Sequence, residues 1–263
     1  MPQLKSEGII LRSVNWKEHS RIVTFFTDNA GKLAIVDRGG RSIKSKRGRL
    51  LSFSRLEITY FKSERTGTGY IGEVEPLESF SLERDGSLGR LTFASAALEI
   101  LNDLLPESEP QEDLYHLTVT FLRHIDIDPK GALLAVFLAY FIKLLSYMGY
   151  RPNLAGCVTC GRERGEIAGD HQAALAFSPE RGGLVCHACQ TAGEYYIRVQ
   201  PDQLDTLYSL QTSSLSEAAG VQLTMRKGEE LLEILTTFMK YQTGTGELKS
   251  LKFLEKLKRT QLT

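Results

Sequence analysis

Residues 20–38 read SRIVTFFTDNAGKLAIVDR, and this stretch decides the fold of the first part of the chain. Apolar and polar residues alternate through 21–27 and again through 32–38, which is typical of half-buried strands. The turn Asp28-Asn29-Ala30-Gly31 suits a hairpin, because Asn and Gly tolerate positive φ. The stretch therefore predicts two antiparallel strands.

Three more strands are predicted over residues 7–13, 50–62 and 70–77. The alternation is clearest in the second of these, where Leu56, Ile58 and Tyr60 are separated by polar residues. Five short strands within the first 80 residues indicate a small barrel or sandwich, and an OB-like barrel is one of few architectures of this size.

The spacing of apolar residues changes to three or four beyond residue 88, which predicts helices. Helices are expected over 88–105, 114–125 and 131–147, and the third is apolar on nearly every side. Such a helix belongs at the centre of a bundle. Further helices are expected from Pro201, over 231–239 and over 248–257.

Two C-x-x-C pairs lie between these helical regions, separated by 25 residues. Each pair forms a tight turn that directs two sulfurs to one point, and two such turns complete a tetrahedral shell around zinc. The intervening residues 177–185 suit a hairpin around Arg181-Gly182-Gly183. The predicted ligands of one zinc ion per chain are Cys157, Cys160, Cys186 and Cys189.

Four protein ligands leave no open coordination position, so the predicted zinc is structural rather than catalytic. Disulfides or free thiols are the alternative. His171 and His187 lie close in sequence and could also act as ligands.

The formal net charge is zero, but the charges are unevenly distributed along the chain. Residues 1–80 contain 14 Lys and Arg against nine Asp and Glu, whereas residues 81–150 contain five against ten. A basic first third and an acidic second third therefore cancel, and the first third remains compatible with a nucleic-acid partner.

No acid occurs between residues 38 and 55, where the glycine- and serine-rich connection between two strands is strongly basic. Such a loop can follow a phosphate backbone without reading its sequence, or it can be a solvated loop without a partner. Its basic residues are Arg38, Arg41, Lys44, Lys46, Arg47, Arg49 and Arg55.

Trp16, the only tryptophan, lies in a polar loop and could stack on a base or cap the end of the barrel. A second basic patch near the end of the chain could bind DNA or be a solvated helix face. It contains Lys249, Lys252, Lys256, Lys258 and Arg259.

Motifs of common enzyme classes are missing from the sequence. We find no phosphate-binding P-loop, no dinucleotide fingerprint, no H-E-x-x-H and no G-x-S-x-G. The sequence therefore predicts a protein that is not an enzyme. It also shows no secretory signal and no apolar run long enough for a membrane span, so we expect a cytoplasmic protein without a membrane partner.

Several segments together resemble the RecO family of bacterial recombination mediators and DNA repair proteins. The resemblance begins at residues 7–12 (EGIILR), 20–27 (SRIVTFFT), 31–34 (GKLA) and 38–41 (RGGR). It continues through the first cysteine pair, residues 182–186 (GGLVC) and residues 248–254 (LKSLKFL). The segments occur in order over nearly the whole chain.

This resemblance implies a mediator of the RecF pathway that binds single- and double-stranded DNA and anneals complementary strands. It implies RecR and single-strand-binding protein as partners, RecA as an indirect partner, and an association with the bacterial nucleoid. It places DNA contacts in the barrel loops, here from Arg38 to Arg49, together with Arg12.

The expected fold is an α+β multidomain protein. An N-terminal five-stranded OB-fold barrel (residues 1–80) is followed by a C-terminal helical bundle (81–152 and 195–263) with a four-cysteine zinc-finger insertion (153–194). An RNA-binding OB-fold protein and a zinc-containing protein-interaction adaptor are the alternative functions.

Overall fold

The computed structural model describes residues 3–40, 52–63, 69–82, 88–127, 132–169 and 175–252. The described residues up to Asp126 form one compact unit, and those from Ile127 to Lys252 form another. The domain limits expected from the sequence stay predictions.

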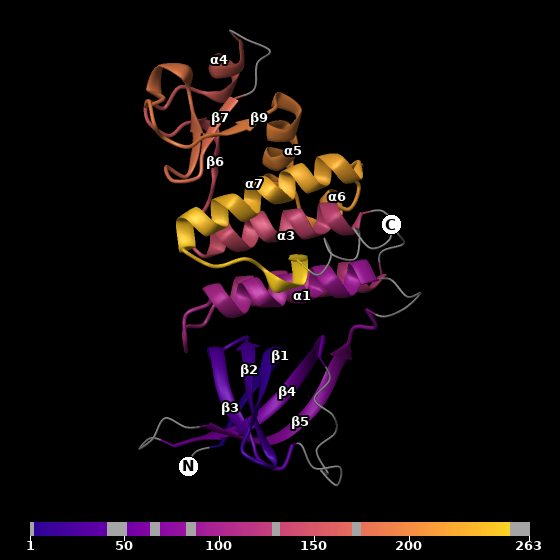
Figure 1. Cartoon of the computed structure of the whole chain (residues 1–263). Helices are drawn as coiled ribbons and strands as arrows, with labels where there is room; N and C mark the ends of the chain where they lie inside the picture. The colour runs from indigo at the N-terminus through magenta and orange to yellow at the C-terminus, as the bar shows by residue number, and fades with distance from the viewer. Residues whose placement is uncertain are drawn as a thin grey trace, which may run out of the picture. The chain divides into compact units, whose positions relative to one another are not determined.

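A closed five-stranded barrel forms the first part of unit 1 (Figure 1). Neighbouring strands are antiparallel, except that β3 and β5 are parallel, and the order around the barrel is β1-β2-β3-β5-β4. This is the predicted OB-fold barrel. The strands are β1 (Gln3–Trp16), β2 (Ser20–Thr27), β3 (Gly31–Asp37), β4 (Ser54–Lys62) and β5 (Gly69–Ser79).

The predicted fourth strand begins too early. β4 starts at Ser54, because Phe53 has a φ of 57°, which an extended strand does not allow. The alternation within β4 is as predicted, and its inward side chains join those of the other strands in the barrel core. That core consists of Ile10, Val23, Phe25, Leu33, Ile35, Leu56, Ile58, Tyr60 and Ile71.

Helices α1 (Leu88–Leu104) and α2 (Glu112–Ile127) complete unit 1 and pack at the end of the barrel that carries the β2–β3 turn. Lys32 of β3 donates from Nζ to the carbonyl oxygen of Asn102 (2.8 Å) near the C-terminus of α1. Phe26 of β2 meets Tyr115 of α2 edge-to-face, with ring centroids 5.5 Å apart. We call this end of the barrel the helix end.

The opposite end of the barrel carries the β1–β2 turn (residues 17–19), residues 38–40 after β3, and the start of β5. We call it the loop end. Segment 41–51, which contains most of the predicted basic loop, follows Gly40 and lies outside the described residues.

Unit 2 is built around α3 (Leu133–Tyr147), the helix predicted at the centre of a bundle. Ten of its residues are buried, and it packs against α5 (Pro201–Thr212), α6 (Leu215–Ala218) and α7 (Met225–Thr243) (Figure 1). Gly228 of α7 contacts Leu134 so closely that a Cβ at this position would overlap its side chain. A larger residue at position 228 would therefore force the side chain of Leu134 to shift.

A small sheet and the cysteine pairs are inserted between α3 and α5, as predicted. The sheet order is β6-β8-β7-β9, and its β7–β8 hairpin is the one expected around Arg181. The elements are β6 (Asn153–Cys157), α4 (Arg164–Gly169), β7 (Leu175–Ser178), β8 (Gly183–Val185), the 3₁₀ turn η2 (His187–Cys189) and β9 (Ile197–Val199).

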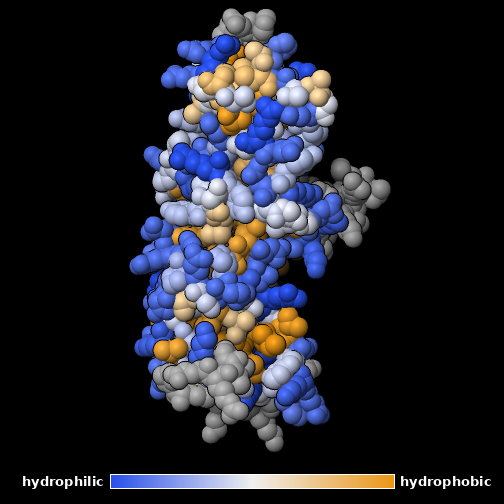
Figure 2. Space-filling model, turned by 90° about the vertical axis from the view of Figure 1, so that its left-hand side faces the viewer, coloured by the Kyte–Doolittle hydropathy of each residue, from blue (hydrophilic) through white to orange (hydrophobic). Residues whose placement is uncertain are grey.

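Polar residues cover most of the molecular face in Figure 2, and apolar side chains appear in small groups between them. Among the described residues, no helix combines the length and the apolar character that crossing a membrane requires.

Gly31 should be more sensitive to substitution than Gly39. Both have positive φ, 66° and 73°, so Gly→Ala costs about 1–2 kcal/mol of backbone strain at either position. At position 31 the new Cβ would also overlap the backbone of Glu109, whereas position 39 has open space. We expect Gly31→Ala to lose a further ~1–3 kcal/mol in urea unfolding. Equal losses in the two variants would mean that the 105–111 linker does not pack tightly on the barrel.

Candidate functional site

The four cysteine sulfurs form one cluster. All lie within 4.8 Å of one another, and the Sγ atoms of Cys160 and Cys186 are 3.7 Å apart. A tetrahedral zinc site with bonds of about 2.3 Å has sulfur–sulfur edges of roughly 3.8 Å. The structure therefore brings together the four predicted residues in a geometry that could bind a metal ion. They are free cysteines, and His187 is exposed and does not belong to the cluster.

Tight turns produce this convergence. The N–H of Gly161 donates to the carbonyl oxygen of Cys157 (2.9 Å), and the φ of Gly161 is 75°, which favours a glycine in this turn. The second cysteine pair also lies in a turn, in which the N–H of Cys189 donates to the carbonyl oxygen of Cys186 (2.9 Å). Strands β6 and β8 pair in parallel and lead into the two turns, which therefore lie side by side.

The cluster resists carrying four negative charges by itself. Burial tends to raise the pKa of Cys157, but backbone N–H donors, first that of Cys186, outweigh it and lower the pKa to about 6. The pKa of Cys189 rises to about 12, chiefly because Cys186 and Cys160 surround its thiol. One sulfur ionises readily while another holds its proton, and a bound divalent cation would remove this conflict.

Arg181 at the tip of the β7–β8 hairpin supports the second cysteine turn from outside. Its guanidinium donates to the carbonyl oxygen of Cys189 (3.2 Å), to the hydroxyl of Thr191 (2.8 Å) and to Glu194 (2.5 Å). The hydroxyl of Tyr196 also donates to Glu194 (2.7 Å), and Tyr196 and Arg181 together lower the pKa of that carboxyl group. No local sequence pattern signals this network, because its members are separated by loops.

Three of the predicted DNA contacts fall on described residues, all in unit 1. Arg12 is exposed on β1 opposite Thr24, and Trp16 lies at the end of β1 opposite Ser20, with 37% of its surface exposed. Arg38 is exposed at the loop end. The others, Arg41, Lys44, Lys46, Arg47 and Arg49, lie outside the described residues.

Two cations lie over aromatic rings at the loop end. The Nζ of Lys17 is 4.4 Å from the ring centroid of Trp16, and the guanidinium carbon of Arg38 is 3.7 Å from that of Tyr70. The sequence alone does not predict a role for Lys17 or Tyr70. The second contact joins the residue directly after β3 to a residue of β5, and only the closed barrel brings the two together.

A second arginine at this end is neutralised. The Nε of Arg21 donates to the Oδ2 of Asp37 (2.9 Å), and the side chain of Asp37 is 2% exposed. The two residues are cross-strand partners in β2 and β3. Because the carboxylate of Asp37 compensates the charge of Arg21, this arginine has no excess positive charge with which to bind a phosphate.

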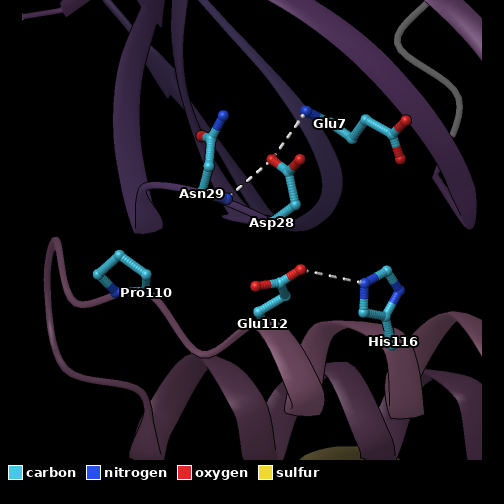
Figure 3. Close-up of a pocket in the computed structure, with 6 residues that line it drawn as sticks. All are labelled: Glu7, Asp28, Asn29, Pro110, Glu112 and His116. Atoms are coloured by element: carbon cyan, nitrogen blue, oxygen red, sulfur yellow. Dashed lines mark hydrogen bonds and ion pairs between the residues drawn. The ribbon is translucent and has the colours of Figure 1, made fainter.

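The helix end has the opposite electrostatic character. Figure 3 shows a pocket of about 450 Å³ between the β2–β3 turn and the N-terminus of α2. Asp28 accepts hydrogen bonds there from the backbone N–H groups of Glu7 (3.0 Å) and Asn29 (2.8 Å). The pocket is lined by Glu7, Asp28, Asn29, Pro110, Glu112 and His116. The pocket has three carboxylates, of which Glu7 pairs with Arg55 (3.6 Å), so it is less favourable to phosphate than the exposed Arg38 at the other end.

Of the predicted tail patch, only Lys249 and Lys252 are described. Lys252 forms an ion pair with Glu247, so its charge is locally compensated. The other three residues lie outside the described part of the chain.

Comparison with known proteins finds one family. The family model "Recombination protein O N terminal" matches residues 1–80, and "Recombination protein O C terminal" matches residues 86–252. The DNA repair protein RecO of Symbiobacterium thermophilum is 32% identical over 253 residues, which is 96% of each chain. The protein of the same name from Anaeromyxobacter sp. (strain K) is 29% identical, over 98% of each chain. That from Bacillus pumilus is 28% identical, over 97% of this chain and 94% of its own length.

Arg181→Met should weaken metal binding by the cysteine cluster. The substitution removes the donors that hold the second cysteine turn, and loss of such a supporting contact typically lowers metal affinity about 10–100-fold. Competition between the purified protein and a chromogenic chelator for added Zn²⁺ measures the change. Arg226→Met, which also removes an arginine paired with a glutamate in unit 2, is the control. Equal affinities of the two variants would mean that Arg181 does not support the cluster.

Proposed function

The chain belongs to the RecO family of DNA repair proteins, and on this premise we propose that it binds single- and double-stranded DNA and anneals complementary strands. The resemblance seen in the sequence motifs is thereby confirmed. Within the RecF pathway, the protein would act with RecR to help load RecA onto DNA coated with single-strand-binding protein. It would do so without catalysing a reaction, in the bacterial cytoplasm at the nucleoid.

The observation that supports DNA binding most directly is the separation of charge along the barrel. Arg38 is exposed at the loop end and has no carboxylate within ion-pair distance among the described residues, whereas three carboxylates line the pocket at the helix end. The basic segment 41–49 continues from Arg38 along the chain. A phosphate backbone would therefore be attracted more strongly to the loop end than to the helix end.

Trp16 adds a stacking surface to this cationic end. An aromatic ring that stacks on an unpaired base contributes about 1–3 kcal/mol without selecting sequence. Lys17, over the same ring, supplies a positive charge for the adjoining phosphate. Cations that neutralise the phosphates of two strands lower their mutual repulsion, which would favour annealing.

We also propose that the cysteine cluster binds one structural Zn²⁺. Four thiolates would complete the shell, so the ion would stabilise the fold rather than bind substrate. Few other apolar residues pack around the cysteines: the described cluster adds Val158, Val185, Ile167 and Tyr196. A metal would therefore contribute much of the stability of this segment.

Binding to single strands should depend steeply on salt. If about five phosphates are neutralised, a plot of log affinity against log salt concentration has a slope of about −3.5. Fluorescence anisotropy with a labelled oligo-dT measures this slope, and unlabelled RNA of matched length tests whether the site prefers RNA. A flat salt dependence would contradict the electrostatic mechanism.

Replacing the five basic residues 41, 44, 46, 47 and 49 with Ala should abolish annealing and leave the fold intact. The assay uses complementary oligonucleotides coated with single-strand-binding protein. The control removes the same number of charges from exposed positions of unit 2: Arg151, Arg162, Arg198, Arg226 and Lys240. Annealing that survives the barrel substitutions but not the control ones would place the DNA site in unit 2.

Elemental analysis should find one zinc per chain of purified protein. Cys186→Ser should lower this ratio and the thermal stability together, because the buried sulfur is replaced by a poorer ligand. A metal-free wild-type protein with an unchanged unfolding midpoint would contradict the structural role of zinc.

A further inference from the structure

We infer that Tyr70 is a positioning residue for DNA binding, which holds the guanidinium of Arg38 flat and ready for a phosphate of single-stranded DNA. This inference deepens the proposed function and rests on it. The sequence alone predicts that Arg38 contacts DNA, whereas it assigns no role to Tyr70. The structure makes the two residues one unit.

The geometry of the pair is that of a stacked guanidinium. The guanidinium carbon of Arg38 is 3.7 Å from the ring centroid of Tyr70, which is the contact distance of two flat groups. Tyr70 is half-buried on β5, and Arg38 is exposed immediately after β3. The ring thus provides a surface fixed in the barrel, and the arginine lies on its accessible side.

Stacking leaves the hydrogen-bonding edge of an arginine free. The five N–H donors of a guanidinium lie in its plane and match the oxygens of a phosphate, so a ring against the face of the group does not occupy them. Arg21 at the same end differs, because its Nε is bound to Asp37. Of these two arginines, Arg38 alone combines a fixed orientation with an uncompensated charge within the described residues.

Tyr70 owes its position to the closure of the barrel. It pairs with Val36 in the parallel β3–β5 contact and with Phe61 in the antiparallel β4–β5 contact. Arg38 follows Val36 by two residues, so the pairing that closes the barrel also sets the distance between ring and guanidinium. Orienting the side chain before binding reduces the rotamer entropy that is lost when the phosphate is bound.

The stacked arginine directly precedes the basic segment along the chain. Arg38 immediately precedes Gly39, whose φ of 73° turns the chain at the start of residues 39–51. The cations of positions 41–49 follow Arg38 along the chain. The pair of Arg38 and Tyr70 would anchor the strand at one fixed point.

A double-mutant cycle tests the coupling. Binding of the full-length protein to labelled oligo-dT is measured for wild type, Arg38→Ala, Tyr70→Leu and the double variant. We expect Tyr70→Leu to weaken binding about two- to fivefold, the range of a cation–π contact at an exposed site. In the Arg38→Ala background the same substitution should have no further effect. An equal loss in both backgrounds would overturn the inference, since Tyr70 would then act independently of Arg38.

Conservative variants separate positioning from folding. Tyr70→Phe keeps the ring face and should restore the affinity that Tyr70→Leu loses. Arg38→Lys keeps the positive charge but removes the flat guanidinium. Because Arg38 is exposed, this variant should fold, so it tests the inference even if Tyr70→Leu does not fold. It should weaken binding when Tyr70 is present, while leaving the salt slope near that of wild type. Binding by Arg38→Lys equal to wild type would also overturn the inference.

Unit 2 supplies a matched control. Arg164 lies over the ring of Tyr208 at 4.7 Å, a cation–π contact within unit 2, and it also forms an ion pair with Asp205. Tyr208→Leu and Arg164→Lys should leave oligo-dT binding within error of wild type, and losses equal to those at the barrel would overturn the inference. A wild-type protein that does not bind oligo-dT would overturn the proposed function as well. Salt-dependent wild-type binding without coupling between positions 38 and 70 would overturn only the role of Tyr70.

Discussion

Parallel pairing of β3 with β5, by two residue pairs among the described residues, closes the barrel, and much of unit 1 depends on it. Ile35 pairs with Gly69, and Val36 pairs with Tyr70. The first pair requires glycine on β5, because a Cβ at position 69 would overlap the side chain of Ile35. Without this contact β3 and β5 would become open edges, and the inward side chains of five strands would lose a common core.

Closure has an electrostatic consequence at the loop end. Asp37, the last residue of β3, is almost fully buried and would be costly there without a partner. Arg21 on the adjacent strand supplies that partner, and Asp37 directly precedes Arg38 along the chain. One arginine thus compensates a buried charge, and the next remains exposed on Tyr70. Two residues of the same type have different roles because of the strand pairing around them.

The zero net charge of the chain hides this arrangement. Arg38 is exposed at the loop end, while carboxylates from both the barrel and α2 lie at the helix end. Glu112 is the carboxylate that the acidic second third contributes to this pocket. In the cysteine cluster, local turns place the sulfurs, whereas Arg181 and its hydrogen-bond partners stabilise the second turn from outside.

Local patterns in the sequence determined the elements and the chemistry they carry. Alternating residues predicted the five strands, the apolar stretch around Phe137 predicted the central helix of unit 2, and two C-x-x-C pairs predicted the sulfur cluster. Each pattern spans a few neighbouring residues, so periodicity and spacing reveal it. The residue pattern did not predict where β4 begins, because the positive φ of Phe53 excludes this residue from a strand that its sequence would suit.

Tertiary structure alone decided which distant residues act together. The stack of Arg38 on Tyr70, the ion pair of Arg21 with Asp37 and the network around Arg181 all join residues from different strands or loops. No local period encodes such partners, because they meet only when the sheet has closed in one register and the hairpins have folded. The sequence by itself thus determined the basic barrel and the four clustered cysteines, and the closed fold determined which charges remain available.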